Sequence, residues 1–253
     1  MSTALATRTT VRGMPVMIAL GLVCVLLVSG CAFPHRNHRT ASLARAHGPA
    51  PTAQQLIAAL QKNFRAISTF HVLMQVQNPG NAAPDQVQIR DANGDVIMPD
   101  KIKAQATVVL SGQSVQVSLI SVGEAQFITD PITGQWRVIK GVLDPRTLTN
   151  PDTGITALVS KVQNISQPVA ANANGTPCWS VNGQLDAKYL AFITGGGVPA
   201  GTMLQTNACI GQADALPYRV SVTGEAAPGD TPQTVRVFDL SNYNEHITIS
   251  APL

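Results

Sequence analysis

The sequence is poor in aromatic and charged residues. Phe, Trp and Tyr make up 4% of the 253 residues and Asp, Glu, Lys and Arg 12%, whereas 45% are hydrophobic. An interior with so few rings must be filled by Val, Ala, Leu and Ile. Such side chains can line an apolar cavity, but they are equally usual in closed β-rich cores. Composition alone therefore leaves both arrangements open.

The sequence also lacks the short motifs of common catalytic chemistry. It contains no G-x-S-x-G elbow, no S-x-x-K, no H-E-x-x-H and no phosphate-binding glycine loop. Only two of its five histidines, His71 and His246, lie in the part expected to fold. A proline follows Asp144 and another precedes Asp152, which favours turn and cap roles for these carboxylates. We therefore expect no enzyme activity, no metal site and no cofactor.

An apolar run near the start, Val16–Val28, leads into Leu27-Val28-Ser29-Gly30-Cys31 and follows two arginines. Small residues directly before a cysteine are what a lipoprotein signal peptidase requires, and the thiol can carry a diacylglycerol. The run is shorter than the roughly 20 residues that span a bilayer. An ordinary secretory signal or a short membrane anchor is the alternative. We expect cleavage between Gly30 and Cys31, and a Cys31 diacylglycerol–palmitate anchor on the outer face of the cell membrane.

Removal of residues 1–30 would leave 15 basic and 14 acidic residues. A nearly neutral chain has no general attraction for nucleic acid, so we expect no such partner. Residues 32–51 lack apolar periodicity and contain three prolines, as in a flexible tether; its arginines and histidines either contact anionic head groups or are merely solvated. The expected parts are a signal peptide (1–30), a lipidated cysteine with its tether (31–51) and one domain (52–253).

Of the four cysteines, two lie in the signal and lipidation segment and two lie in the expected domain. Cys24 would leave with the signal and Cys31 would carry lipid, which leaves Cys178 and Cys209 as one pair in an oxidising setting. We expect a structural disulfide that closes a loop of roughly 30 residues. A metal or redox pair is the weaker alternative, because neither cysteine has a C-x-x-C neighbour or a nearby histidine.

Hydrophobic periodicity predicts two meanders separated by helices. A helix over 53–67, with the capping pair Thr52 and Gln55, precedes the first meander. Strands are expected at 69–76, 87–89, 102–110, 115–119, 125–129 and 135–140, with turns at 78–84 and 91–95. A second helix, 155–165, capped at 152–153, is followed by a strand at 179–185, a short helix at 187–193 and strands at 204–210, 218–224, 234–240 and 246–249. This order predicts an α+β fold, with helices on one side of a large antiparallel sheet.

One segment carries a family resemblance. From Leu143 the chain reads D-P-x-x-L-x-N-P-D-T-G-hydrophobic and continues into Leu158-Val159 at the expected second helix. The lipobox, the tether, the opening helix that runs into a strand, Leu110-Ser111-Gly112 and Gln135-Trp136 support it. In these features the sequence resembles the mycobacterial LppX/LprG/LprA/LprF lipoprotein family, and most of all its LprF branch.

The resemblance implies a strongly curved antiparallel half-barrel, LolA/LolB-like, with helices on the concave face that enclose an apolar lipid cavity. It also implies a membrane-anchored lipoprotein that carries acylated glycolipid or phospholipid in the cell envelope, with a di- or tri-acylated glycolipid as cargo. The rival interpretation is a tethered module that regulates a membrane transporter or sensor kinase; a hydrolase is more distant. The residues expected to line the cavity are Leu56, Leu60, Phe64, Ala104, Ala106, Val108, Leu110, Val115, Val117, Leu119, Ile155, Leu158 and Val162.

Overall fold

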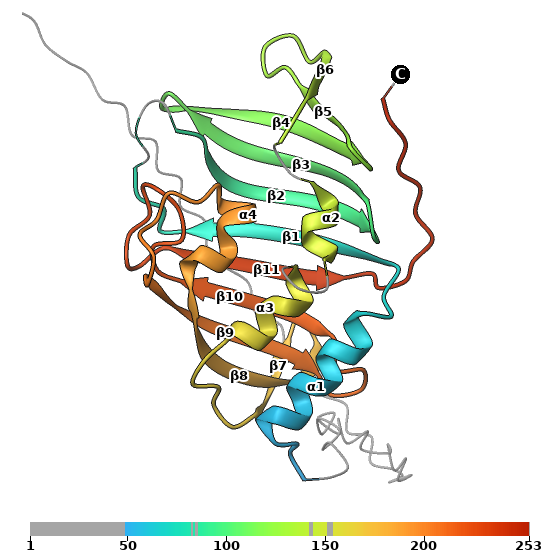
Figure 1. Ribbon diagram of the computed structural model, residues 1–253, viewed down its shortest axis with the longest axis vertical. Coiled ribbons are helices and arrows are strands. Elements are labelled where there is room, and N and C mark those ends of the chain that lie inside the picture. Colours follow the sequence, from blue (N-terminus) through green and yellow to red (C-terminus); the bar gives the residue numbers. More distant parts are fainter. Residues whose placement is uncertain (1–48, 82, 84–85, 142–143, 151–153, 253) are drawn as a thin grey trace, which may run out of the picture. The chain divides into compact units, whose positions relative to one another are not determined.

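The computed structural model describes residues 49–253 except 82, 84–85, 142–143, 151–153 and 253. The expected signal peptide, Cys31, most of the tether and the cap at 152–153 lie outside the described residues. One curved, open antiparallel sheet forms the body of this part of the chain (Figure 1). Its helices lie on the concave face, which confirms the α+β arrangement.

The sheet contains eleven strands, in the order β6-β5-β4-β3-β2-β1-β11-β10-β9-β8-β7. The first meander comprises β1 (Thr69–Gln77), β2 (Gln88–Ile97), β3 (Lys101–Leu110), β4 (Gln113–Val122), β5 (Ala125–Thr129) and β6 (Trp136–Ile139). The second comprises β7 (Val169–Ala173), β8 (Thr176–Asp186), β9 (Met203–Gly211), β10 (Pro217–Thr223) and β11 (Val235–Ser241). The meanders join where β1 pairs with β11.

The helices are short apart from the first. They are α1 (Ala53–Phe64), α2 (Pro145–Thr149), α3 (Ile155–Lys161), the 3-10 turn η1 (Ala187–Leu190) and α4 (Ala191–Thr194). The predicted capping box is present, because the Thr52 hydroxyl accepts from the Gln55 amide and the Gln55 side chain accepts from the Thr52 amide. α4 ends at Gly195, which has the left-handed conformation that glycine adopts most easily.

β2 is longer than the sequence predicted and runs straight through the expected turn at 91–95. Asp91, Asn93 and Asp95 point to the convex face, whereas Ala92 and Gly94 point to the concave face. Gly94 is needed there, since a Cβ on it would lie 2.7 Å from the Ala104 Cβ. Turn-forming residues can therefore form a strand when their alternation matches the polarity of the two faces.

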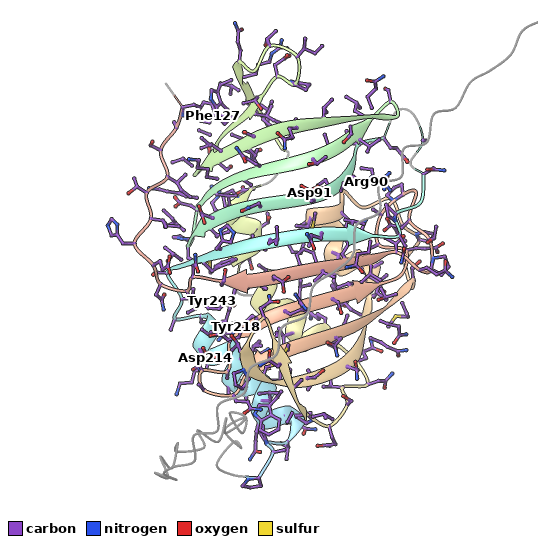
Figure 2. All side chains as sticks on the ribbon, turned by 180° about the vertical axis from the view of Figure 1, so that it is seen from behind. Arg90, Asp91, Phe127, Asp214, Tyr218 and Tyr243 are labelled. Atoms are coloured by element: carbon purple, nitrogen blue, oxygen red, sulfur yellow. A yellow bond between two sulfur atoms is a disulfide. The ribbon has the colours of Figure 1, made fainter. Side chains whose placement is uncertain are left out.

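The predicted strand at 246–249 is not formed. The chain after β11 is instead held by loop contacts, in which the Ser68 amide donates to Asn244 Oδ1 and the Asn244 amide to the Thr69 carbonyl. Tyr243 packs edge-on against Tyr218, with ring centroids 5.8 Å apart, and the Tyr218 hydroxyl donates to Asp214 (Figure 2). That hydrogen bond, together with burial, raises the pKa of Tyr218 to about 12. The C-terminal segment is thus anchored without joining the sheet.

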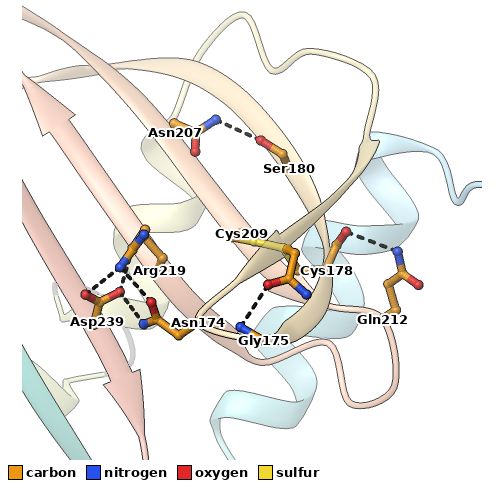
Figure 3. Close-up of a disulfide and its surroundings, with 10 residues drawn as sticks. Asn174, Gly175, Cys178, Ser180, Asn207, Cys209, Gln212, Arg219 and Asp239 are labelled. Atoms are coloured by element: carbon orange, nitrogen blue, oxygen red, sulfur yellow. Dashed lines mark hydrogen bonds and ion pairs between the residues drawn. A yellow bond between two sulfur atoms is a disulfide. The ribbon is translucent and has the colours of Figure 1, made fainter. Parts of the chain in front are cut away.

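The predicted disulfide between Cys178 and Cys209 is present, and joins β8 to β9 (Figure 3). Its Cα atoms lie 5.5 Å apart. The cysteines alternate with Trp179 and Ile210, which pack in the cluster formed with α1 on the concave face. The disulfide therefore lies on the convex face and braces the second meander from behind.

Candidate functional site

Apolar side chains form continuous rows on the concave face of the first meander and of the adjoining strand β11. Cross-strand pairing defines one row as Phe238, Met74, Ala92, Ala106 and Val117. A second row comprises Leu240, Val72, Gly94, Ala104, Leu119 and Ile128. The smallest side chains lie in the middle, on β2 and β3, with larger ones on either side.

We call the part of these rows on β1–β5, with Val76, Val108 and Val115 on the same face, the concave apolar surface. Most of its side chains are only partly buried. Figure 1 shows the reason, because none of the described helices crosses the middle of β3 and β4 on this face. The first meander thus keeps an accessible aliphatic surface inside the curve of the sheet.

The helices close the rest of the concave face. Leu56 and Leu60 of α1 pack against Val181 and Ile210 of the second meander. Phe64 packs against Phe70 of β1 in a tilted arrangement, with ring centroids 5.6 Å apart. Full burial of a Leu, Ile or Phe side chain stabilises the fold by about 1.5–3 kcal/mol. Because so many of its side chains are buried, the concave face of the second meander is a packed core.

The residues expected to line a cavity therefore separate into two groups. The concave apolar surface includes Ala104, Ala106, Val108, Val115, Val117 and Leu119, of which Ala104 also packs against the cluster that contains Phe64 and Phe70. The packed clusters include Leu56, Leu60, Phe64, Ile155, Leu158 and Val162, of which the last three contact the cores from α3 and its end. Leu110 is exposed beside the turn to β4. The residues expected from the sequence did not include Met74, Val76, Ala92 or Ile128, although the alternation in Phe70-His71-Val72-Leu73-Met74-Gln75-Val76 puts Met74 and Val76 on one face of a strand.

The family-like segment builds the helices that border this surface. Asp144 caps α2 by accepting from the Arg146 amide, and its carboxylate pairs with the Arg146 guanidinium at 2.7 Å. This guanidinium holds the pKa of Asp144 below its usual range. Arg146 also reaches Glu124 in the β4–β5 turn, and the Gly154 amide donates to the Asn150 carbonyl before α3. The motif therefore fixes α2 and α3 over the sheet.

A buried ion pair lies at the end of the same face. Arg236 of β11 faces inward next to Val76, and its guanidinium meets Asp230 at 2.5 and 2.9 Å. Asp230 also accepts from the amides of Ala226 and Ala227. Because both side chains are almost fully buried, the charge is neutralised within the protein. This end of the concave face is thus closed by a polar but neutral contact.

Two hollows lie elsewhere on the domain. One has a volume of about 310 Å³ and lies between the start of α1 and the segment after α3. It is lined by Ala53, Gln54, Ile57, Val162, Asn164 and Ile165. Another, of about 300 Å³, lies mainly among polar side chains of β1–β4 and includes Gln75, Asn93 and Gln105. Cavities of this size suit small ligands. A lipid with several tails would need the larger area of the concave apolar surface.

Within the described residues, no cluster of three or more His, Cys, Asp or Glu side chains could hold a metal ion. None of the helices in that part of the chain is long and apolar enough to cross a membrane.

Two crystal structures share this fold. LprF from Mycobacterium bovis has a TM-score of 0.62 and 19% identity, covering 81% of this chain and 99% of LprF. Lipoprotein LppX from Mycobacterium tuberculosis has a TM-score of 0.55 and 16% identity, covering 79% of this chain and 100% of LppX. No curated protein sequence matches the chain.

The curved antiparallel sheet with helices on its concave face is therefore the fold of these lipoproteins. The family model LppX_LprAFG lipoprotein matches residues 52–249, and the chain belongs to that family. The family expected from the motif after Leu143 is confirmed.

Proposed function

We propose that this protein binds acylated lipid on the concave apolar surface and carries it in the cell envelope, while Cys31 anchors it to the outer face of the cell membrane. The observation that carries the proposal is the pair of apolar rows that the helices leave partly exposed. The chain buries comparable rows on β8–β11 under α1 and α3. An accessible aliphatic surface inside a curved sheet is thus available for a ligand.

The chemistry of this surface fits acyl chains better than polar ligands. Each CH₂ group moved from water to an apolar site gains about 0.8 kcal/mol, so a few contacts along a tail give useful affinity. Smooth rows of Ala, Val and Leu supply such contacts without fixing the position of a head group. The proposed cargo is a di- or tri-acylated glycolipid or a phospholipid, recognised mainly by its tails.

Native mass spectrometry with organic extraction tests this proposal. The domain from Thr52 onward, purified from an actinobacterial host, is expected to carry an acylated lipid in a defined ratio. The described core clusters lie wholly inside this segment, so the domain retains its packing. A folded domain that is free of lipid, and that takes up no added lipid, would contradict the proposal. That result would favour a tethered module that regulates a membrane protein.

A further inference from the structure

The hairpin between β5 and β6 carries exposed apolar side chains at the edge of the sheet. Ile132 is 92% exposed, Val138 71% and Trp136 36%, and every residue from Pro131 to Val138 is exposed. Figure 1 shows the hairpin extending beyond β4 at this end of the sheet. These three residues form what we call the hairpin tip patch. The sequence is poor in aromatic residues, and one of its two tryptophans lies in this patch.

Hydrogen bonds and an ion pair hold the turn between β5 and β6, although its apolar side chains are exposed. The Asp130 carboxylate accepts from the amides of Ile132 and Thr133 at 3.0 and 2.8 Å. Arg137 pairs with the same carboxylate at 2.7 Å across the hairpin. The contacts therefore hold the turn in shape and present the hairpin tip patch outward, where it contributes little to the packing of the fold.

The hairpin also adjoins the concave apolar surface. Leu119 pairs with Ile128, and Ile128 pairs with Arg137 of β6, so the second apolar row ends at Arg137. Trp136 and Val138 alternate with Arg137 and therefore point to the other face of the same hairpin. Arg137 and Lys140 lie next to the exposed apolar side chains. Tryptophan and aliphatic side chains flanked by basic residues match the interface between acyl chains and head groups. A bilayer is thus the partner whose chemistry fits both the patch and the surface behind it.

We propose that the β5–β6 hairpin inserts Ile132, Trp136 and Val138 into the outer leaflet of a lipid bilayer, so that lipid passes between the bilayer and the concave apolar surface across the β5–β6 edge. This inference rests on the proposed function. It assigns the membrane-facing end of the domain, because the opposite edge strand, β7, is separated from the concave apolar surface by the packed half of the sheet.

Trp136 fluorescence tests the insertion directly. The mature chain from residue 31, with Cys31→Ser to remove the lipid anchor and Trp179→Phe, leaves Trp136 as the single tryptophan. Adding vesicles of phosphatidylcholine and phosphatidylglycerol should shift its emission to shorter wavelength. The Cys31→Ser chain with both tryptophans should float with the same vesicles. Unshifted emission and failure to float would overturn the proposal.

The variant Ile132→Ser/Val138→Ser, in the Cys31→Ser chain, should weaken vesicle partition by about tenfold or more, since two aliphatic side chains no longer leave water. Val169→Ser is the matched control, because Val169 is 65% exposed on the edge strand β7 at the other end of the sheet. It should leave partition unchanged. Equal vesicle partition of the double variant and of the Cys31→Ser chain would overturn the proposal. It would also be overturned if the Cys31→Ser chain formed a dimer that the double variant does not form, with vesicle binding unchanged.

The two proposals can fail separately. Lipid offered in detergent micelles does not need the hairpin, so the double variant should still take it up. Uptake from micelles without vesicle binding by the Cys31→Ser chain would overturn the hairpin and leave the lipid site intact. Vesicle binding without uptake would support the hairpin and contradict the lipid site.

Discussion

Replacing Ala106 with tryptophan is expected to remove most of the lipid that co-purifies with the protein. Ala106 lies in the middle of the first apolar row, between Ala92 and Val117, and is only partly buried. An indole ring there occupies space above the small side chains and displaces acyl methylenes. Loss of only two CH₂ contacts costs about 1.6 kcal/mol, which is more than tenfold in affinity. Extraction and mass spectrometry of the purified variant measure the effect.

Gln105→Trp is the matched control for this experiment. Gln105 is the preceding residue of the same strand, but it is exposed and points to the convex face. The same ring added there should leave the lipid content unchanged. Both variants should give the circular dichroism spectrum of the unsubstituted protein, because neither position lies in a packed cluster. A folded Ala106→Trp protein with normal lipid content would show that the concave apolar surface is not the site.

Asp230→Ala is expected to lower the free energy of unfolding by about 3–5 kcal/mol. The substitution leaves the Arg236 guanidinium buried without its counter-charge, and removal of one partner from a buried pair has this scale of effect. The amides of Ala226 and Ala227 also lose their acceptor. Urea unfolding monitored by tryptophan fluorescence gives the change.

Two further variants distinguish the effect of the buried charge on the free energy of unfolding from the effect of lost contacts in general. Adding Arg236→Met to Asp230→Ala should restore part of the stability, because no uncompensated charge then remains in the interior. Lys188→Ala breaks the half-exposed pair with Asp186 and should cost at most about 1 kcal/mol. Equal unfolding midpoints for Asp230→Ala and Lys188→Ala would mean that the Asp230–Arg236 pair contributes no more than a surface pair.

Alternation was the most informative signal in the sequence, and it worked where it was continuous. In β3 and β4, regular apolar and polar alternation predicted both the strands and the residues that lie on the concave face. The same pattern runs through Asp91–Asp95, but Asp, Asn and Gly there suggested a turn. Only the sheet reveals that the polar members face solvent while Ala92 and Gly94 allow close approach to β3.

The β7–β8 hairpin was missed despite a strong local signal. Asn174-Gly175 has positive φ at both residues, the conformation that a tight two-residue β-hairpin turn requires. In the sequence, Val169–Ala173 has too little apolar and polar alternation to be recognised as a strand by itself. Pairing with β8 provides the context that makes these five residues a strand.

The candidate site could be only half predicted. The inward faces of β3 and β4 followed from periodicity, but periodicity cannot say which apolar faces the helices cover. α1 and α3 bury the second meander and the part of the first that contains Phe70, Val96 and Ile102, and leave the rest of the first meander partly exposed. This depends on where the long-range contacts place each helix. The helix residues expected to contact lipid are for that reason in the packed clusters, while Met74, Ala92 and Ile128 join the surface.

Photo-crosslinking with a lipid that carries a diazirine in its acyl chain tests the central proposal most directly. After irradiation of the loaded protein, peptide mapping is expected to find adducts on the concave face of β1–β4, at residues such as Met74 and Val117. Adducts confined to the convex face, or to the hollow between α1 and the segment after α3, would contradict the proposed site.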